Sequence, residues 1–546
     1  MKDTFSAASN RLEPGDARRS LVFRFGSYSC YSMVFSQRSI GIRRPKIVII
    51  ILSVALTTML YALAKISIYS YSYSSSIIDS NVLDDYINLN KSTGLSNGQP
   101  SFCRNSDPTE CRPRRRITVQ EMISVISKLQ SVNQNQRKIH FRDLTGLGNA
   151  ARIYKDAFDI YYQISVYQPN VTVKLSIEKE LLKLEKKLYP WVINGPMHSS
   201  AIDALFNSSG RGIVITTGSK YALVAKHTIT MLRLIKSTLP IEIMYCGADD
   251  LGTNEFKMLS MLPNVRVVDM RSVLGLKRCE KGWENKPFAV LASRFNQVIL
   301  MDADALFFQP PEVLFEIPRY KETGTLLFRD RTLPFGTYGR GQNLVNMLMD
   351  IAKPFKNQLL YSENRLMRHM TSDEIDSGVV VWNKSKAMPA ILLTCLLNSA
   401  PFKNHIYSNS WGDKETYWLA HEALRIPFSV ASDNGGAIGQ LIHSDGADMV
   451  CGGLYHADDM DRPLWFNGGI GSRIPAKELG ITQVQHWAIE RTGANVKWEI
   501  ATEPFCLHGK LDSPLGVNYS HIGKLTPNEL NLARNMTELW VELFQL

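Results

Sequence analysis

VILMDADALFFQPP, at residues 298–311, is the stretch from which the fold of this chain can be predicted. Its four apolar residues at 298–301 are too few for a helix and predict a short buried strand, which two prolines separate from the next element. Asp302 and Asp304 follow two positions apart, so an extended backbone would place both carboxylates on one side. In a parallel sheet they would lie at the carboxyl end of the strand, where such sheets bind ligands. Paired carboxylates there suit Mg²⁺ or Mn²⁺, which can in turn hold a diphosphate.

The segments around this stretch alternate between strand and helix patterns. Strands are predicted at 212–218, 241–245, 265–269, 325–328 and 378–382, and helices at 222–232, 254–259, 287–293, 343–351, 412–424 and 527–546. Residues 456–469 carry few cues of either kind and are predicted to form a loop. This alternation predicts an α/β fold with a central, mostly parallel sheet.

The N-terminal region differs in character from the rest of the 546-residue chain. Residues 47–64 contain no charge and are long enough to span a bilayer as a signal-anchor helix. Residues 1–46 hold nine Lys or Arg against three acidic residues, which predicts a cytoplasmic tail and a type II orientation. A cleavable signal peptide is the competing interpretation, but its basic region would be unusually long. Beyond the span we expect a lumenal stem at 65–116, a helical lead-in at 117–209 and a globular domain at 210–546.

Composition fits a protein of the secretory pathway. Of the formal charge of +11, six units (nine minus three) come from residues 1–46, which leaves little basis for a nucleic-acid partner. Seven of the eight cysteines follow the predicted span, where disulfides can form, although their connectivity stays open. Six sequons offer glycosylation sites, at Asn90, Asn170, Asn207, Asn383, Asn518 and Asn535.

Five motifs, in order, resemble the fungal Golgi mannosyltransferases. They are GRGIVIT at 210–216, LPIEIMY at 239–245, WENKPFAVLASRFNQVILMDADALFF at 283–308, DSGVVVWNKSK at 376–386 and GDKETYWLA at 412–420. The likeness covers roughly residues 210–467 and is closer to the branch that adds terminal α-1,3-linked mannose. It implies a GT-A-type catalytic domain, GDP-mannose as donor, Mn²⁺ as cofactor, and a mannosylated glycoprotein or oligosaccharide as acceptor. It also implies location in the Golgi membrane and, since donor and product are both α-linked, a retaining reaction.

The resemblance lets roles be assigned to single residues. Asp302 and Asp304 would hold the metal that offsets charge on the departing diphosphate, with Asp302 also at the donor. Lys286 would contact donor phosphate or sugar. The candidate carboxylates for the acceptor hydroxyl or the donor mannose are Asp376, Asp413 and Glu415. His456, which precedes a Pro-Trp element, is the candidate third metal ligand, with His443 and His508 as rivals.

Several alternatives stay open at this point. The linkage could be α-1,2 rather than α-1,3, and the chain could be a non-catalytic glycan-binding relative. An aspartyl-phosphate phosphatase also places Asp-x-Asp after an apolar strand, but it needs Thr or Val where this chain has Leu306. The sequence does not choose between a covalent route through a carboxylate nucleophile and a displacement on one face of the sugar.

Overall fold

Residues 114–545 of a computed structural model are described, apart from gaps at 135–141, 169–172, 277–281, 340, 354–357, 445–446, 469, 472–482, 491–495, 502 and 512–519. The described residues belong to one compact unit. The predicted cytoplasmic tail, the predicted span at 47–64 and nearly all of the predicted stem lie outside them. Within the described residues, no helix is both long and apolar enough to cross a membrane.

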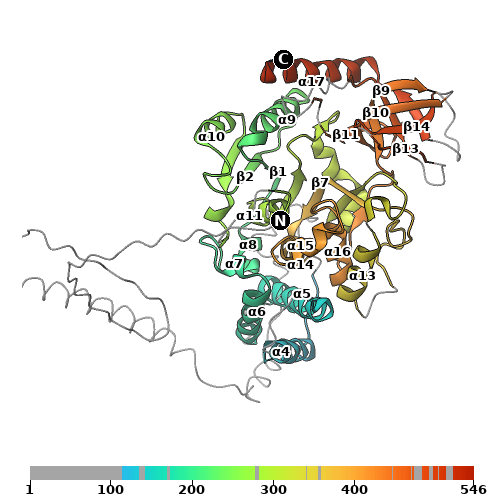
Figure 1. The fold of residues 1–546 in the computed structure, drawn as a ribbon. Coiled ribbons are helices and arrows are strands. Elements are labelled where there is room, and N and C mark those ends of the chain that lie inside the picture. Colours follow the sequence, from blue (N-terminus) through green and yellow to red (C-terminus); the bar gives the residue numbers. More distant parts are fainter. Residues whose placement is uncertain are drawn as a thin grey trace, which may run out of the picture. The chain divides into compact units, whose positions relative to one another are not determined.

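In the described part of the chain, the central sheet has seven strands in the order β3-β2-β1-β4-β7-β6-β8 (Figure 1). They are β1 (Arg211–Thr216), β2 (Ile241–Tyr245), β3 (Val265–Asp269), β4 (Gln297–Met301), β6 (Thr325–Arg329), β7 (Ile375–Asn383) and β8 (Ser429–Val430). β1 pairs in parallel with β2 and β4, β2 with β3, and β6 with β8, whereas β7 runs antiparallel to both of its neighbours. The predicted α/β fold with a mostly parallel sheet is confirmed.

Eight α-helices accompany this sheet in the described residues between Ala222 and Leu424. They are α9 (Ala222–Leu234), α10 (Thr253–Ser260), α11 (Asn285–Ala292), α12 (Pro318–Thr323), α13 (Gln342–Ile351), α14 (Lys384–Leu397), α15 (Phe402–Tyr407) and α16 (Thr416–Leu424). The apolar residues of α9 recur every three or four positions, so Ala225, Ile229 and Leu232 all enter the core. That core also contains Ile213 and Ile299 of the neighbouring strands. The predicted helices between strands are therefore confirmed.

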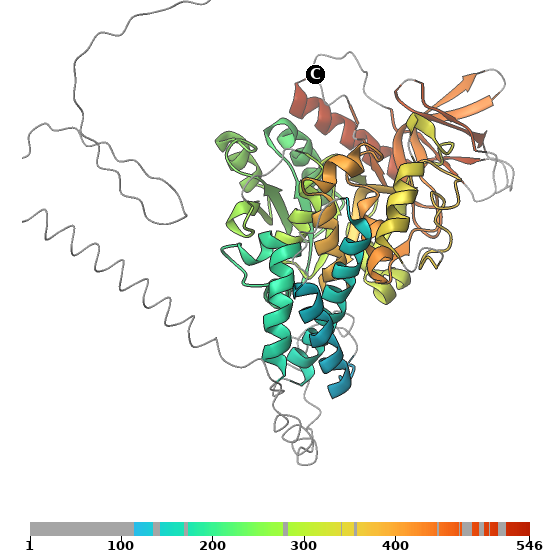
Figure 2. The ribbon, with the colours of Figure 1, turned by 60° about the horizontal axis from the view of Figure 1, so that its bottom comes forward.

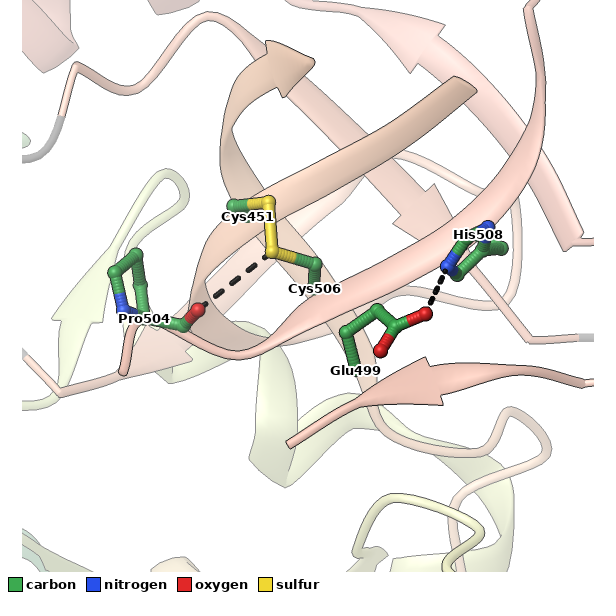
Figure 3. Close-up of a disulfide and its surroundings, with 5 residues drawn as sticks. All are labelled: Cys451, Glu499, Pro504, Cys506 and His508. Carbon is green, nitrogen blue, oxygen red and sulfur yellow. Dashed lines mark hydrogen bonds and ion pairs between the residues drawn. A yellow bond between two sulfur atoms is a disulfide. The ribbon is translucent and has the colours of Figure 1, made fainter. Parts of the chain in front are cut away.

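A second sheet lies beside the first and was not predicted from the sequence. Among the described residues it has eight strands, in the order β13-β14-β15-β12-β9-β10-β11-β5. They are β5 (Leu306–Phe307), β9 (Gly436–Ser444), β10 (Ala447–Ala457), β11 (Pro463–Asn467), β12 (His486–Ile489), β13 (Trp498–Glu499), β14 (Cys506–Leu511) and β15 (Ser520–Lys524). The disulfide Cys451–Cys506 joins β10 to β14 (Figure 3).

Half of the loop predicted at 456–469 is strand in the structure. β10 pairs with β11 so that His456 lies opposite Trp465, and only the polar residues between the two strands form a turn. β9 and β10 escape detection because each contains two glycines, which strands usually avoid. Gly439 and Gly452 lie opposite each other, and a Cβ at Gly452 would come within 1.9 Å of the carbonyl oxygen of Ile438. Close approach of the backbones explains the glycines.

The two sheets are joined by the residues that follow β4. The chain turns at Asp302, where the Ala305 amide donates to the Asp302 carbonyl over 3.2 Å, and then continues into β5, which pairs with β11. The aspartates therefore lie in a turn and not in the extended backbone predicted for them. They stand where the central sheet meets the second sheet.

The predicted helical lead-in packs directly on the rest of the unit (Figure 2). It consists of α4 (Val119–Gln134), α5 (Leu144–Tyr167), α6 (Lys174–Leu188), α7 (Pro190–Ile193) and α8 (Ala201–Phe206). On α5, the Arg152 guanidinium donates to the carbonyls of Ile351 and Ala423, over 2.9 and 3.1 Å. A Cβ at Gly148 would lie 2.0 Å from the Ile351 carbonyl oxygen, so α5 and α13 are in close contact. The lead-in is part of the folded core.

The C-terminal helix α17 (Pro527–Phe544) confirms the predicted helical tail. Thr526 and Glu529 cap its first turn reciprocally, as a capping box. It packs on α9, where His227 Nε2 lies 2.8 Å from the Met536 carbonyl and the His227 and Trp540 rings are perpendicular with centroids 5.3 Å apart. Helix α17 thus lies along both α9 and the second sheet (Figure 1).

Candidate active site

A cleft of about 1090 Å³ opens at the carboxyl ends of β1, β2 and β4. Of the described residues, those lining it are 216–221 and Val224 after β1, Met244, Asp249 and Asp250 at the end of β2, 282–286 at the start of α11, 302–304 after β4, and Lys403 with Tyr407 on α15. Ligands of open α/β sheets bind at this edge. The cleft is also large enough for a nucleotide-sized ligand.

Lys286 is buried at the base of this cleft with its charge paired. Its Nζ lies 2.8 Å from Asp302 Oδ1 and 3.5 Å from Asp413 Oδ2, and it donates to the carbonyl and the hydroxyl of Ser377 over 3.0 and 3.1 Å. Burial alone would lower the pKa of Lys286, but the carboxylates of Asp302 and Asp413 raise it above its ordinary value. The site therefore holds a fixed ammonium group, as the donor-binding role predicted for Lys286 requires.

Asp302 and Asp304 both line the cleft, although they reach it through a turn. The side chain of Asp302 is 25% exposed and its backbone N–H donates to the Gly378 carbonyl over 2.8 Å. Burial raises the pKa of Asp302 above its ordinary value, against the lowering effect of Lys286. Two carboxylates at an open edge match the oxygen donors that a hard divalent cation prefers, so this pair fits the predicted metal.

His456 does not join the two aspartates. Its Nε2 lies 3.0 Å from Asp376 Oδ2, its ring stacks on Trp465 with centroids 4.2 Å apart, and it is 2% exposed. Throughout the ranges that the structure describes, no three His, Cys, Asp or Glu side chains are gathered so that they could hold a metal. In this structure His456 is therefore the partner of Asp376, and its predicted role as a third ligand beside Asp302 and Asp304 gains no support.

The rival histidines lie in the second sheet. His443 Nδ1 is 2.5 Å from Asp448, its cross-strand neighbour, and His508 Nε2 is 3.0 Å from Glu499 on the adjacent strand β13 (Figure 3). Neither of them lines the cleft. The structure therefore gives no support to either residue as the metal ligand.

Asp376 and Asp413 stand behind Lys286 and do not line the cleft. Asp376 Oδ1 accepts from the Gly378 amide over 2.9 Å, and its other oxygen holds His456. Asp413 is 2% exposed and accepts from the Tyr417 hydroxyl over 2.6 Å. In this structure both carboxylates orient and charge-balance the residues in front of them. Direct contact with a sugar, as predicted, would need them to be uncovered.

Glu415 is placed away from the cleft, contrary to its predicted role at the donor or acceptor sugar. It is 0% exposed, accepts from the backbone amides of Glu374 and Ile375 over 2.9 and 3.4 Å, and also bonds Trp418. The sequence could not separate Glu415 from Asp413, because both fall in the helical run predicted at 412–424. In the structure this helix begins only at Thr416, and the turn before it directs Asp413 to Lys286 and Glu415 to the backbone amides of Glu374 and Ile375.

Sequence reasoning missed the residues at both ends of the cleft. At one end the Ser219 amide donates to the Asp250 carbonyl over 2.8 Å, which ties the loop after β1 to the loop after β2. At the other end lie Trp283 and Tyr407. The loops after β1 and β2 could have been predicted as part of the site from their places in the sequence, because loops that follow parallel strands converge at one edge of the sheet.

The structure describes three of the six predicted glycosylation sites. Asn207 is exposed at the end of α8 and Asn535 is half-buried on α17, whereas Asn90, Asn170 and Asn518 lie outside the described residues. Asn383 is 2% exposed, and its side chain caps α14 by accepting from the Ser385 amide over 2.9 Å. A glycan on Asn383 is incompatible with this fold, which corrects that predicted site.

Comparisons with known proteins agree with the motifs. Residues 210–458 match the family model described as "Mannosyltransferase putative". Two Saccharomyces cerevisiae relatives are the α-1,3-mannosyltransferase MNT3, 26% identical over 48% of this chain and 47% of that protein, and the α-1,3-mannosyltransferase MNN1, 24% identical over 48% and 41%. The chain thus spans about half the length, or less, of these relatives.

Among solved structures, the bifunctional glycosyltransferase WbbM is similar at 12% identity, with a TM-score of 0.27 over 57% of this chain and 59% of that chain. A likeness this weak leaves the fold class to rest on the strand order of the chain itself.

Proposed function

We propose that this chain is a fungal-type mannosyltransferase, because its residues 210–458 match the mannosyltransferase family model. In this proposal it is a GT-A-type enzyme that transfers mannose from GDP-mannose to α-mannosyl residues of N- or O-linked glycans. The bond formed would be α-1,3, the linkage that the names of the matched relatives carry. One observation carries the proposal. It is the ion pair of Lys286 and Asp302, at the base of an open cleft where three parallel strands end.

The charges of the cleft suit a diphosphate leaving group. Negative charge builds on the departing GDP, and an ammonium group already held by four protein oxygens can stabilise that charge without reorganising. Asp302 and Asp304 would hold the proposed Mn²⁺, which when bound offsets diphosphate charge. The pairing with Asp302 keeps Lys286 charged in the absence of donor, so the site needs no proton transfer to become active.

Retention of configuration is part of the proposal, because donor and product are both α-linked. A covalent route requires a carboxylate facing the sugar. Asp413 is covered by Lys286 and Tyr417, and Asp376 by His456. A displacement on one face of the sugar, in which the leaving phosphate accepts the acceptor proton, needs no such carboxylate. The arrangement therefore favours that route.

We place the enzyme in the Golgi lumen as a type II membrane protein. The disulfide Cys451–Cys506 supports an oxidising compartment, and the predicted span at 47–64 and the exposed sequon at Asn207 agree with it.

The test is mannosyl transfer by the full chain in detergent, with GDP-mannose, Mn²⁺ and methyl α-mannoside. We expect Asp302→Asn and Asp304→Asn to abolish transfer, because both residues face the cleft. Asp448→Asn is the matched control, since its carboxylate pairs with His443 in the second sheet. Undiminished transfer by Asp304→Asn would contradict the assignment of the site. Binding of the mannoside without any turnover by the unaltered chain would favour the non-catalytic, glycan-binding alternative.

A further inference from the structure

Trp283 is a large apolar side chain left open to solvent at the rim of the cleft. It is 55% exposed, lines the cleft and directly precedes the first turn of α11. Single exposed apolar residues are common on proteins, but an indole at the mouth of a ligand-sized cleft is not accounted for by packing.

The ring of Trp283 packs against the backbone of Gly412. Gly412 has a φ of +69°, and a Cβ built on it would lie 2.5 Å from Cε3 of the Trp283 ring. The indole therefore rests on bare backbone, in a place that no side chain at 412 could share. The segment that carries Trp283 and the segment that carries Gly412 also meet deeper in the cleft, where Lys286 pairs with Asp413. Trp283 thus stands directly outside the charged base of the cleft.

Trp283 lies at the end of the cleft away from the β1–β2 loops. Lys286 bonds Ser377 of β7, and β7 flanks β4 on the side opposite to β1 and β2. The loops after β1 and β2 form the other end, with Tyr221 and Asp250. Nucleotides bind at the ends of the parallel strands. With the diphosphate at Asp302, the nucleoside extends towards β1 and β2, and the end near Trp283 is left for the second substrate.

We propose that Trp283 is the stacking platform of an acceptor subsite, on which the C–H-bearing face of a mannoside ring lies. An indole offers a flat, rigid apolar face of low conformational entropy, and its negative π-face attracts the weakly positive C–H bonds of a pyranose. Glu284 and Lys403 also line the cleft and form a largely buried ion pair over 3.2 Å, so charged groups that could bond sugar hydroxyls lie next to Trp283. This inference rests on the proposed mannosyl transfer and names the residue that selects its acceptor.

The test compares Trp283→Ala with the full unaltered chain. We expect the KM for methyl α-mannoside to rise about tenfold, which equals about 1.4 kcal/mol of binding, with the KM for GDP-mannose unchanged. Trp283→Phe should retain most of the affinity because it keeps an aromatic face. Trp411→Ala is the matched control, because Trp411 is 48% exposed and does not line the cleft. It should leave both KM values unchanged.

A second readout does not depend on transfer. Saturation-transfer NMR should show methyl α-mannoside bound to the unaltered chain and to Trp411→Ala, and not to Trp283→Ala. A higher KM for GDP-mannose in Trp283→Ala would overturn the proposal, since Trp283 would then stack on the nucleobase. Equal mannoside affinity in Trp283→Ala and the unaltered chain would also overturn it, while leaving the proposed transfer intact. If the unaltered chain transfers no mannose at all, the proposed function fails, and the NMR comparison still decides the role of Trp283.

Discussion

Replacing Lys286 with methionine removes the charge at the base of the cleft while keeping a side chain of similar length. Lys286 is 2% exposed and its ammonium contacts two carboxylates and Ser377. We expect Lys286→Met to abolish transfer and GDP-mannose binding, because the diphosphate then meets the carboxylates of Asp302 and Asp304 without the ammonium group that offsets their charge.

The cost in stability can be estimated from the partners that Lys286 leaves behind. Removing one member of a buried ion pair costs about 3–5 kcal/mol, since the other charge stays buried without its counter-ion. Asp302 is 25% exposed and can be hydrated, while Asp413 keeps its bond from Tyr417. The loss in unfolding free energy should therefore lie near the lower end, at about 3 kcal/mol. Urea denaturation at neutral pH measures it.

Lys414 provides the matched control for this experiment. It is also a buried lysine, paired with Asp330 over 2.7 Å and with Asp373 over 3.1 Å, and it does not line the cleft. Lys414→Met should lose stability to a similar extent but should still bind GDP-mannose when folded. Equal loss of GDP-mannose binding by the folded fractions of both variants would refute the reasoning, because it would show that folding and not the charge of Lys286 determines binding.

Three further predictions concern stability and topology. Burial raises the pKa of Glu185 from 4.5 to about 7, so the folded chain keeps a proton that the unfolded chain loses, and unfolding free energy should fall as pH rises from 4.5 to 7. Glu185→Gln should reduce this pH-dependent loss of unfolding free energy by up to about 3 kcal/mol, because glutamine does not titrate. Urea denaturation across the pH range measures it, and the same pH dependence in Glu185→Gln and the unaltered chain would contradict the prediction. Gly148→Ala should lower the melting temperature and transfer together, because its Cβ would meet the Ile351 carbonyl at 2.0 Å. If neither falls, the contact between α5 and α13 is looser than the structure shows. In sealed microsomes the lumenal domain should resist protease until detergent is added, and digestion without detergent would reverse the predicted orientation.

Much of the central sheet could be predicted because its signals are local. β2 and β3 coincide with their predicted bounds, since each is an apolar run closed by turn residues. Lys286 and Asp302 were found because one lies in the first turn of α11 and the other directly follows β4, and the structure brings them to 2.8 Å. These are the features that neighbouring residues in the sequence determine.

The second sheet and the surroundings of the site depend on distant partners and could not be predicted. β5 has two residues and is a strand only because β11, more than 150 residues away, pairs with it. His456 looked like a loop ligand, yet its position opposite Trp465 directs it to Asp376. Asn383 carries a sequon, but the strand that ends there buries it. In each case tertiary pairing overrode the local pattern.

The central claim is that this cleft transfers mannose from GDP-mannose with retention. NMR of the disaccharide formed by the full chain from GDP-mannose and methyl α-mannoside, with Mn²⁺, tests it most directly. We predict one product, whose new anomeric carbon is α and is joined to O3 of the acceptor. A β-linked product would contradict the retaining mechanism, an α-1,2 bond would contradict the linkage, and release of mannose or GDP without any disaccharide would contradict the claim that the cleft is a transferase site.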